Sequence, residues 1–170
     1  MQRSIRLWSC VAAIAALAMP ARAFLWTFND PLSGLQEVPP NNSPATGSTW
    51  GTFDDVTNMI TLNAYAYPLL SGITASHLHA PAPPGANAGV IISVGVGSGG
   101  LYEYQVVNFT ATLTNQQEQW LMDGLVYLNV HSPQYPGGEV RGQINLVPEP
   151  GSLAALVFGA AVLARRKRRR

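Results

Sequence analysis

Three histidines are the side chains of this sequence with the clearest capacity for chemistry. His77 and His79 stand two residues apart and His131 follows much later, and the chain has no other histidine. Residues i and i+2 of a strand project from the same face of a sheet, about 6.6 Å apart. If the flanking β-branched residues form a strand, His77 and His79 therefore point the same way. Imidazoles that converge with a carboxylate are borderline ligands, which suit Zn(II) or Cu(II).

The second histidine run has its own alternating pattern. In residues 125–131, Tyr127, Asn129 and His131 fall on one face of a predicted strand and apolar residues fall on the other. A Pro/Gly turn follows, which would fold the chain back so that Glu139 and Arg141 lie beside this strand. Two interpretations stay open at this point. One is a metal site at His77, His79 and His131, and the other is a structural polar cluster of Asn129, Glu139 and Arg141 around His131, because buried histidines are commonly satisfied by carbonyls and carboxylates.

Enzymatic motifs are missing from the sequence. It contains no G-x-S-x-G, H-E-x-x-H or G-x-x-x-x-G-K pattern. A copper/zinc dismutase would need more than three imidazoles, and the glycine-rich residues 95–100 are followed by neither a helix nor a lysine. We therefore predict that the protein is not an enzyme and has no catalytic residues. No cofactor is expected, with Zn or Cu bound by the histidines as the alternative.

The N-terminus has the features of a cleaved signal peptide. Arg3 and Arg6 precede an apolar run over residues 7–19, and Ala21-Arg22-Ala23 is an A-x-A cleavage site. Residues 1–23 are thus predicted to be removed, and the mature chain would begin at Phe24. The single cysteine, Cys10, would leave with the signal, so the mature protein would have no thiolate ligand or nucleophile.

The C-terminus carries a second sorting element over residues 147–170. Val147, Pro148, Glu149 and Pro150 precede an apolar segment at 153–164 and six basic residues at 165–170. A helix of that apolar length spans about 18 Å, short of the ~30 Å hydrocarbon core, which favours transient insertion in the inner membrane. The arrangement resembles the PEP-CTERM sorting signal, which implies removal of the tail by the membrane protease exosortase. An ordinary tail anchor with a basic cytoplasmic stop remains the alternative.

Without these ends, the charge of the chain changes sign. The whole sequence has a formal charge of +1, but residues 24–146 contain eight acids and one cation, Arg141, which gives −7. Nucleic acid binding needs cations at the phosphate contacts, so this composition excludes it. A secreted, soluble module is consistent with the balance.

Residues 24–146 have the composition of one all-β domain. They are rich in Val, Ile, Thr, Tyr, Gly and Pro, and Pro/Gly/Asn clusters separate short runs that read as strands. The one helical signal begins at Thr114 and ends at Gly124. These features predict a β-sandwich or a partly closed barrel. The expected strands are residues 24–29, 32–38, 47–53, 59–67, 73–80, 90–97, 102–113 as one or two, 125–131 and 139–147.

Several of these segments together resemble the CHRD domain, a module of secreted proteins. The residues that carry the resemblance are LQEVPP at 35–40, ATG at 45–47, HLHAP at 77–81 with Gly85 and Gly89, YLNVHS at 127–132 and GGEVRGQI at 137–144. The resemblance implies an immunoglobulin-like or superoxide-dismutase-like β-fold without established enzymatic activity. With the C-terminal signal, it implies an exported, non-catalytic protein of the cell surface or extracellular matrix, with exopolysaccharide or matrix proteins as partners. The alternative function is extracellular metal binding by His77, His79 and His131.

Overall fold

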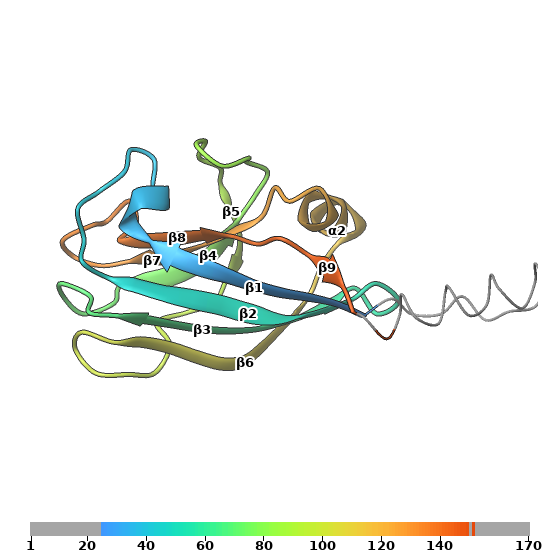
Figure 1. Ribbon diagram of the computed structural model, residues 1–170, viewed down its shortest axis with the longest axis horizontal. Coiled ribbons are helices and arrows are strands. Elements are labelled where there is room, and N and C mark those ends of the chain that lie inside the picture. The colour runs from blue at the N-terminus through green and yellow to red at the C-terminus, as the bar shows by residue number, and fades with distance from the viewer. Residues whose placement is uncertain (1–24, 150, 152–170) are drawn as a thin grey trace, which may run out of the picture.

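The computed structural model describes residues 25–149 and Gly151 (Figure 1). The predicted signal peptide at 1–23, the predicted apolar C-terminal helix at 153–164 and the basic tail at 165–170 lie outside the described residues. Within the described part, no helix is both long and apolar enough to cross a membrane.

The fold is all-β, as the sequence predicts. One antiparallel sheet has the strand order β5-β4-β7-β8-β1-β2-β3-β6, with β9 paired to β1, and it curls into a nearly closed barrel (Figure 1). The strands are β1 Leu25–Ser33, β2 Thr46–Asp54, β3 Met59–Tyr67, β4 Ala75–His79, β5 Val90–Ser93, β6 Tyr104–Thr112, β7 Tyr127–His131, β8 Val140–Gln143 and β9 Val147–Pro148; the helices are the 3-10 turn η1 Gly34–Gln36 and α2 Asn115–Met122.

Strict alternation of side chains places the core inside the barrel. On β3, Ile60, Leu62, Ala64 and Ala66 are fully buried, and the residues between them are at least partly exposed. On β4, β7 and β8 the apolar side chains of Leu78, Leu128, Val130 and Val140 join the same core. The histidines and the polar side chains of β7 and β8 therefore project from the outer face of the sheet, whereas Ser76 of β4 lies on the inner face with Leu78.

The strand that begins the domain differs from the prediction. Two short strands at 24–29 and 32–38 were expected, but β1 runs without interruption from Leu25 to Ser33 and pairs with β2 over nine residues. Pro31 lies within it, opposite Ser48, and the chain turns away only at η1. The continuous partner strand holds the backbone extended through the proline, which local sequence rules do not anticipate.

The predicted helix and the long sixth strand are confirmed. Thr114 caps α2 through a capping box, in which its hydroxyl accepts a hydrogen bond from Gln117 N while the Gln117 side chain accepts one from Thr114 N. Residues 104–112 form one strand, and its register shifts opposite Asn63 because the side-chain oxygen of Asn63 accepts a hydrogen bond from Asn108 N.

Candidate metal centre

The sheet brings the three histidines together. His77 on β4 pairs with Asn129 on β7, and His131 ends β7, so the adjacency of the two histidine runs follows from the β4–β7 ladder. The imidazole centroids lie 5.0 to 5.9 Å apart, and one nitrogen from each ring falls within 4.8 Å of the others. His79 is buried, and His77 and His131 are partly exposed. The cluster thus lies at the surface, and His79 is more deeply buried than the other two histidines.

Backbone carbonyls fix the tautomers of two of these rings. Nδ1 of His79 lies 3.0 Å from the carbonyl oxygen of Ala88, and Nδ1 of His131 lies 3.0 Å from that of Pro136. A carbonyl oxygen only accepts, so each Nδ1 carries the hydrogen and each Nε2 of the neutral ring is left with a free lone pair. This second-shell arrangement is the one that metal-binding histidines generally have.

The free nitrogens of the cluster face one another. Nε2 of His131 lies 3.1 Å from Nδ1 of His77, which donates to it when both rings are neutral. Nε2 of His79 is buried and has no hydrogen-bond partner. Burial lowers the pKa of His79 and of His131, and the neighbouring imidazoles act in the same direction, against the carbonyls of Ala88 and Pro136. Both rings are therefore held in the neutral form that a metal ion requires.

His79 is the first of three stacked side chains, followed by Tyr127 and Arg141. Its ring lies parallel to Tyr127, with centroids 5.0 Å apart and planes inclined by 8°. The guanidinium carbon of Arg141 lies 3.5 Å from the centroid of the same tyrosine ring. Because β7 lies between β4 and β8, His79 and Arg141 cover opposite faces of Tyr127. The stack limits rotation of the His79 ring.

Arg141 also holds the loop whose Ala88 carbonyl accepts the hydrogen bond from His79. Its guanidinium donates to the carbonyl oxygens of Ala86 (2.7 Å) and Pro83 (3.4 Å), to Asn87 Oδ1 (3.4 Å) and to Gln143 Oε1 (3.1 Å). Tyr127 extends the same support, because its hydroxyl accepts a hydrogen bond from Ala88 N at 3.1 Å. Arg141 is 1 % exposed, and it pairs with Asn129 of β7. It therefore lies on the outer side of β4, β7 and β8, which also carries the three histidines and which we call the histidine face.

The remaining residues of the predicted polar cluster have separate partners. Glu139 is buried, but its Oε1 accepts from Ser43 Oγ at 2.8 Å and from Leu70 N at 2.7 Å. Asn129 donates to Glu37 Oε2 at 3.4 Å and to the carbonyl of Gly137 at 3.2 Å. The expected grouping of Glu139 with Arg141 is thus not what the hydrogen bonds show. The carboxyl group on which the charge of Arg141 acts is instead that of Glu37, which no sequence pattern indicates.

Glu37 lies near Asn129 and Arg141, and the sequence analysis did not identify it as a candidate residue. It is 5 % exposed, and its Oε1 and the Oδ1 of Asn129 are both buried without a hydrogen-bond partner. Burial raises the pKa of Glu37 to about 7, although Arg141 and the hydrogen bond from Asn129 act to lower it. Its place within the LQEVPP segment was the available signal, but nothing local shows that this segment folds over β7.

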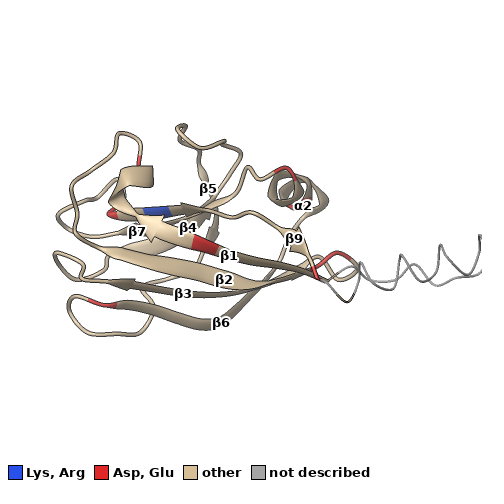
Figure 2. Cartoon of the chain, in the orientation of Figure 1, with Lys and Arg blue, Asp and Glu red and all other residues tan. Residues whose placement is uncertain are grey.

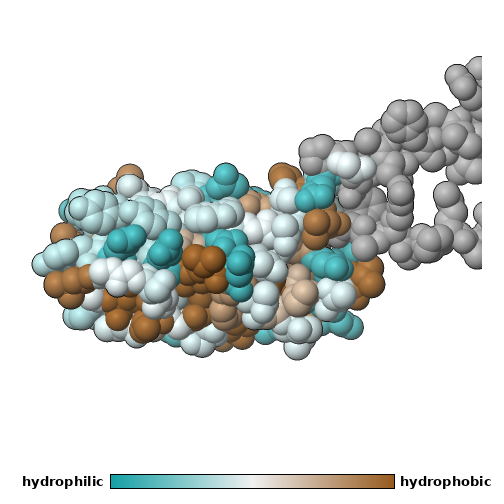
Figure 3. Space-filling model, turned by 90° about the horizontal axis from the view of Figure 1, so that it is seen from below, coloured by the Kyte–Doolittle hydropathy of each residue, from teal (hydrophilic) through white to brown (hydrophobic). Residues whose placement is uncertain are grey.

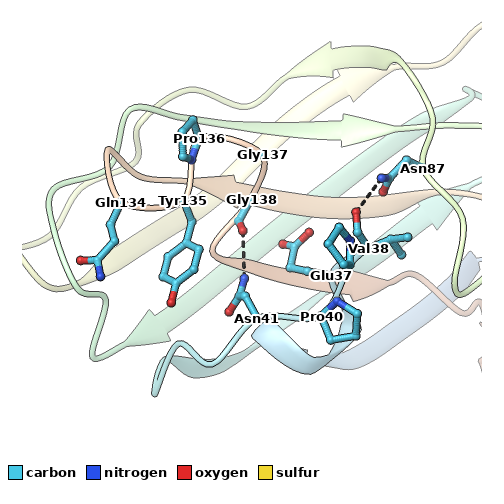
Figure 4. Close-up of a pocket in the computed structure, with 11 residues that line it drawn as sticks. Glu37, Val38, Pro40, Asn41, Asn87, Gln134, Tyr135, Pro136, Gly137 and Gly138 are labelled. Carbon is cyan, nitrogen blue, oxygen red and sulfur yellow. Dashed lines mark hydrogen bonds between the residues drawn. The ribbon is translucent and has the colours of Figure 1, made fainter.

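A hollow of about 310 Å³ lies where Glu37 meets the turn after β7 (Figure 4). Asn41 joins the two walls by donating to the carbonyl of Gly138 at 3.0 Å, and Asn87 donates to the carbonyl of Val38 at 2.8 Å. These bonds use the amide groups internally. The amides of Asn41 and Asn87 are therefore already occupied by the walls of the hollow.

The sorting segment begins inside the folded domain. Val147 and Pro148 form β9 against Thr27 and Trp26, and Glu149 N donates to the carbonyl of Leu25 at 3.2 Å. Pro150 lies outside the described residues. The start of the predicted motif is therefore held at the edge of the barrel, next to the point where the described chain begins.

Comparison with known proteins agrees with the two resemblances in the sequence. The CHRD domain model matches residues 28–144, and the PEP-CTERM protein-sorting motif matches residues 146–170. No curated protein and no solved structure matches the chain. The sorting motif marks the protein for export, for processing by the membrane enzyme exosortase and for the cell surface. The chain therefore belongs to the CHRD domain family and carries a C-terminal PEP-CTERM sorting motif.

Proposed function

We propose that the exported domain binds a transition metal ion, Zn(II) or Cu(II), through His77, His79 and His131. The observation that carries this proposal is the unpartnered, buried Nε2 of His79 in a cluster of three imidazoles, each of which offers one nitrogen within 4.8 Å of the others. A buried polar atom without a partner costs about 1–3 kcal/mol, and a metal ion would satisfy it. An all-imidazole donor set suits both metals.

The three ligand atoms lie within 4.8 Å of one another and must move closer together to hold an ion. Nitrogens bound to one zinc ion at about 2.0–2.1 Å lie about 3.3 Å apart in a tetrahedral site. The 3.1 Å between His77 Nδ1 and His131 Nε2 is close to this value. His77 must then carry its hydrogen on Nε2, so that Nδ1 is free for the ion. Three protein ligands leave a fourth position, which in this partly exposed site water or an external ligand would fill.

Calorimetric titration of the purified full-length protein with Zn(II) and with Cu(II) tests the metal site. We expect one ion per chain, and a loss of affinity of about a hundredfold or more for the His77→Ala, His79→Ala double variant, because one imidazole remains. Glu118→Gln is the matched control, since it removes a carboxylate on α2 and leaves the three histidines unchanged. Equal heats from the native protein and the double variant would leave the histidines a structural role.

The broader role that we propose is a non-catalytic module of the cell surface or matrix. CHRD domains form a non-catalytic module family, and the sorting motif directs this one to the surface. The −7 charge of residues 24–146 supports partners other than nucleic acid, and exopolysaccharide or matrix proteins fit an exported protein. Detection of the protein in a washed matrix fraction rather than in the cytoplasm tests this role separately from metal binding.

Processing at both ends gives a further expected outcome. We expect the mature protein to begin at Phe24 and to lack the residues that follow the Pro148 region, because a cleavable signal and a complete sorting motif are both present. Intact-mass measurement of the exported form checks this. A surface form that still carries residues 165–170 would contradict removal of the tail.

A further inference from the structure

The outward side of β2 and β3 exposes three aromatic rings. Trp50 is 40 % exposed, Tyr65 37 % and Tyr67 53 %. Trp50 lies opposite Asn63, and Asn63, Tyr65 and Tyr67 follow one another at alternate positions of β3. All three rings therefore project from the same face, on the opposite side of the sheet from Leu62, Ala64 and Ala66.

The rings lie close enough to act together. Residues two apart on a strand are separated by about 7 Å, which places Tyr65 beside Tyr67. Trp50 is the diagonal neighbour of Tyr65 across the β2–β3 ladder, at about 7–8 Å. The result is a short row of half-exposed rings that runs along β3. We call the outward side of β1, β2, β3 and β6 the aromatic face.

The aromatic face has no charge between the ends of its strands. Its other side chains are neutral hydroxyl and amide groups with a few apolar ones, and Figure 2 shows β2 and β3 uncoloured along their middle lengths. Seen from the side of β6, apolar residues are interspersed with polar ones and form no continuous band (Figure 3). The outward residues, as the described strands and their register place them, are Leu25, Thr27, Asn29, Pro31, Ser33, Thr46, Ser48, Trp50, Thr52, Asp54, Met59, Thr61, Asn63, Tyr65, Tyr67, Gln105, Thr110 and Thr112, with the carboxylate of Asp54 at the end of β2.

We propose that the aromatic face binds a neutral polysaccharide chain. The apolar faces of sugar rings pack on Trp and Tyr rings, while their hydroxyls exchange hydrogen bonds with Ser, Thr, Asn and Gln side chains. The lack of charge on the middle of this face matches a partner that is itself uncharged, and the net charge of −7 of residues 24–146 opposes an acidic one. This inference deepens the proposed surface and matrix role and is independent of the metal site.

A protein partner fits the same face less well. Specific protein interfaces generally have an apolar centre enriched in Arg and aromatic residues. Here the three rings are separated by hydroxyl and amide side chains, and no Arg or Lys lies on the face. A row of separated rings on a polar, uncharged surface suits an extended hydroxylated chain, which needs repeated stacking and hydrogen bonding.

Affinity electrophoresis tests the proposal. The native full-length protein would be run in gels that contain a soluble neutral α-glucan, β-glucan, mannan or xylan, beside the Trp50→Ala, Tyr65→Ala double variant. We expect at least one polysaccharide to retard the native protein, and about tenfold weaker binding by the double variant, since two stacked rings are lost. Leu35→Ala is the matched control, because Leu35 is 76 % exposed and lies on η1, away from the face.

Two results would overturn the proposal. One is native mobility in all four polysaccharides, and the other is equal retardation of the native protein and the double variant. If sedimentation shows that the double variant alters self-association without altering retardation, the aromatic face is a protein interface instead. The fractionation assay proposed above for matrix association is independent of these results, so failure of that role and failure of this site are distinguishable.

Discussion

Replacing Arg141 with methionine is expected to lower the free energy of unfolding by about 2–4 kcal/mol. The side chain is 1 % exposed, and its guanidinium donates to two carbonyls of the loop before β5, to Asn87 and to Gln143. Methionine fills much of the same volume but supplies no donor. The Gln143 oxygen would lose its guanidinium donor, and Glu37 would lose the cation that acts to lower its pKa.

The expected loss of unfolding free energy in Arg141→Met is smaller than the loss on breaking a fully buried ion pair. Pro83 and Asn87 are exposed, so water replaces part of what the guanidinium provides to them. Chemical denaturation at pH 7 gives the measurement, and Arg141→Lys is the control, since it keeps the charge but not the planar fork that contacts Tyr127 and the loop together. An unchanged denaturant midpoint in Arg141→Met would show that these contacts contribute no net stability.

The sequence predicted the local parts of the histidine face correctly. The H-x-H spacing and the alternation in residues 125–131 are sufficient to place His77 with His79, and His131 with Tyr127 and Asn129, because strand periodicity is a local property. The all-β class, the hairpin of β2 and β3 and the cap at Thr114 follow from equally local signals. The adjacency of β4 and β7, which brings the two histidine runs together, does not follow from any local pattern and is seen in the ladder between these strands.

The missed features depend on contacts between distant segments. The carbonyls of Ala88 and Pro136 that fix the histidine tautomers belong to loops, whose paths no periodic pattern specifies. Glu37 reaches Asn129 across 92 residues of sequence. The expectation for Glu139 was wrong in its partners. Its carboxylate accepts hydrogen bonds from Ser43 Oγ and Leu70 N, which belong to segments far from it in the sequence. Such contacts are fixed by the packed fold rather than by spacing.

Glu37 gives the second large expected effect, which depends on pH. Burial raises its pKa from 4.5 to about 7, so between these values the folded protein retains a proton that the unfolded chain has lost. Stability from this residue therefore falls as pH rises through that window. Each pKa unit corresponds to about 1.4 kcal/mol, so the total loss is about 3 kcal/mol above pH 7.

The protonated form also explains two unpartnered atoms. Glu37 Oε1 and Asn129 Oδ1 are both acceptors when Glu37 is ionised, and an alanine Cβ in place of Gly138 would lie 2.6 Å from the first and 2.3 Å from the second, so both atoms lie beside this glycine. A neutral Glu37 has a hydroxyl that can donate toward Asn129, in addition to the bond that Asn129 Nδ2 donates to Oε2. Ionisation removes that donor from a buried site.

Replacing Glu37 with glutamine isolates this effect, since an amide keeps the shape and a donor but does not titrate. We expect Glu37→Gln and the native protein to have similar unfolding free energies near pH 4.5, and the variant to be more stable by about 2–3 kcal/mol at pH 8. His79 and His131 act in the opposite direction: their pKa values are lowered by folding, so their contribution to stability rises with pH. They are present in both proteins, so the difference between the two denaturation curves reports Glu37. A difference that stays constant from pH 4.5 to 8 would show that folding does not raise the pKa of Glu37, with Arg141 offsetting the burial of the carboxyl.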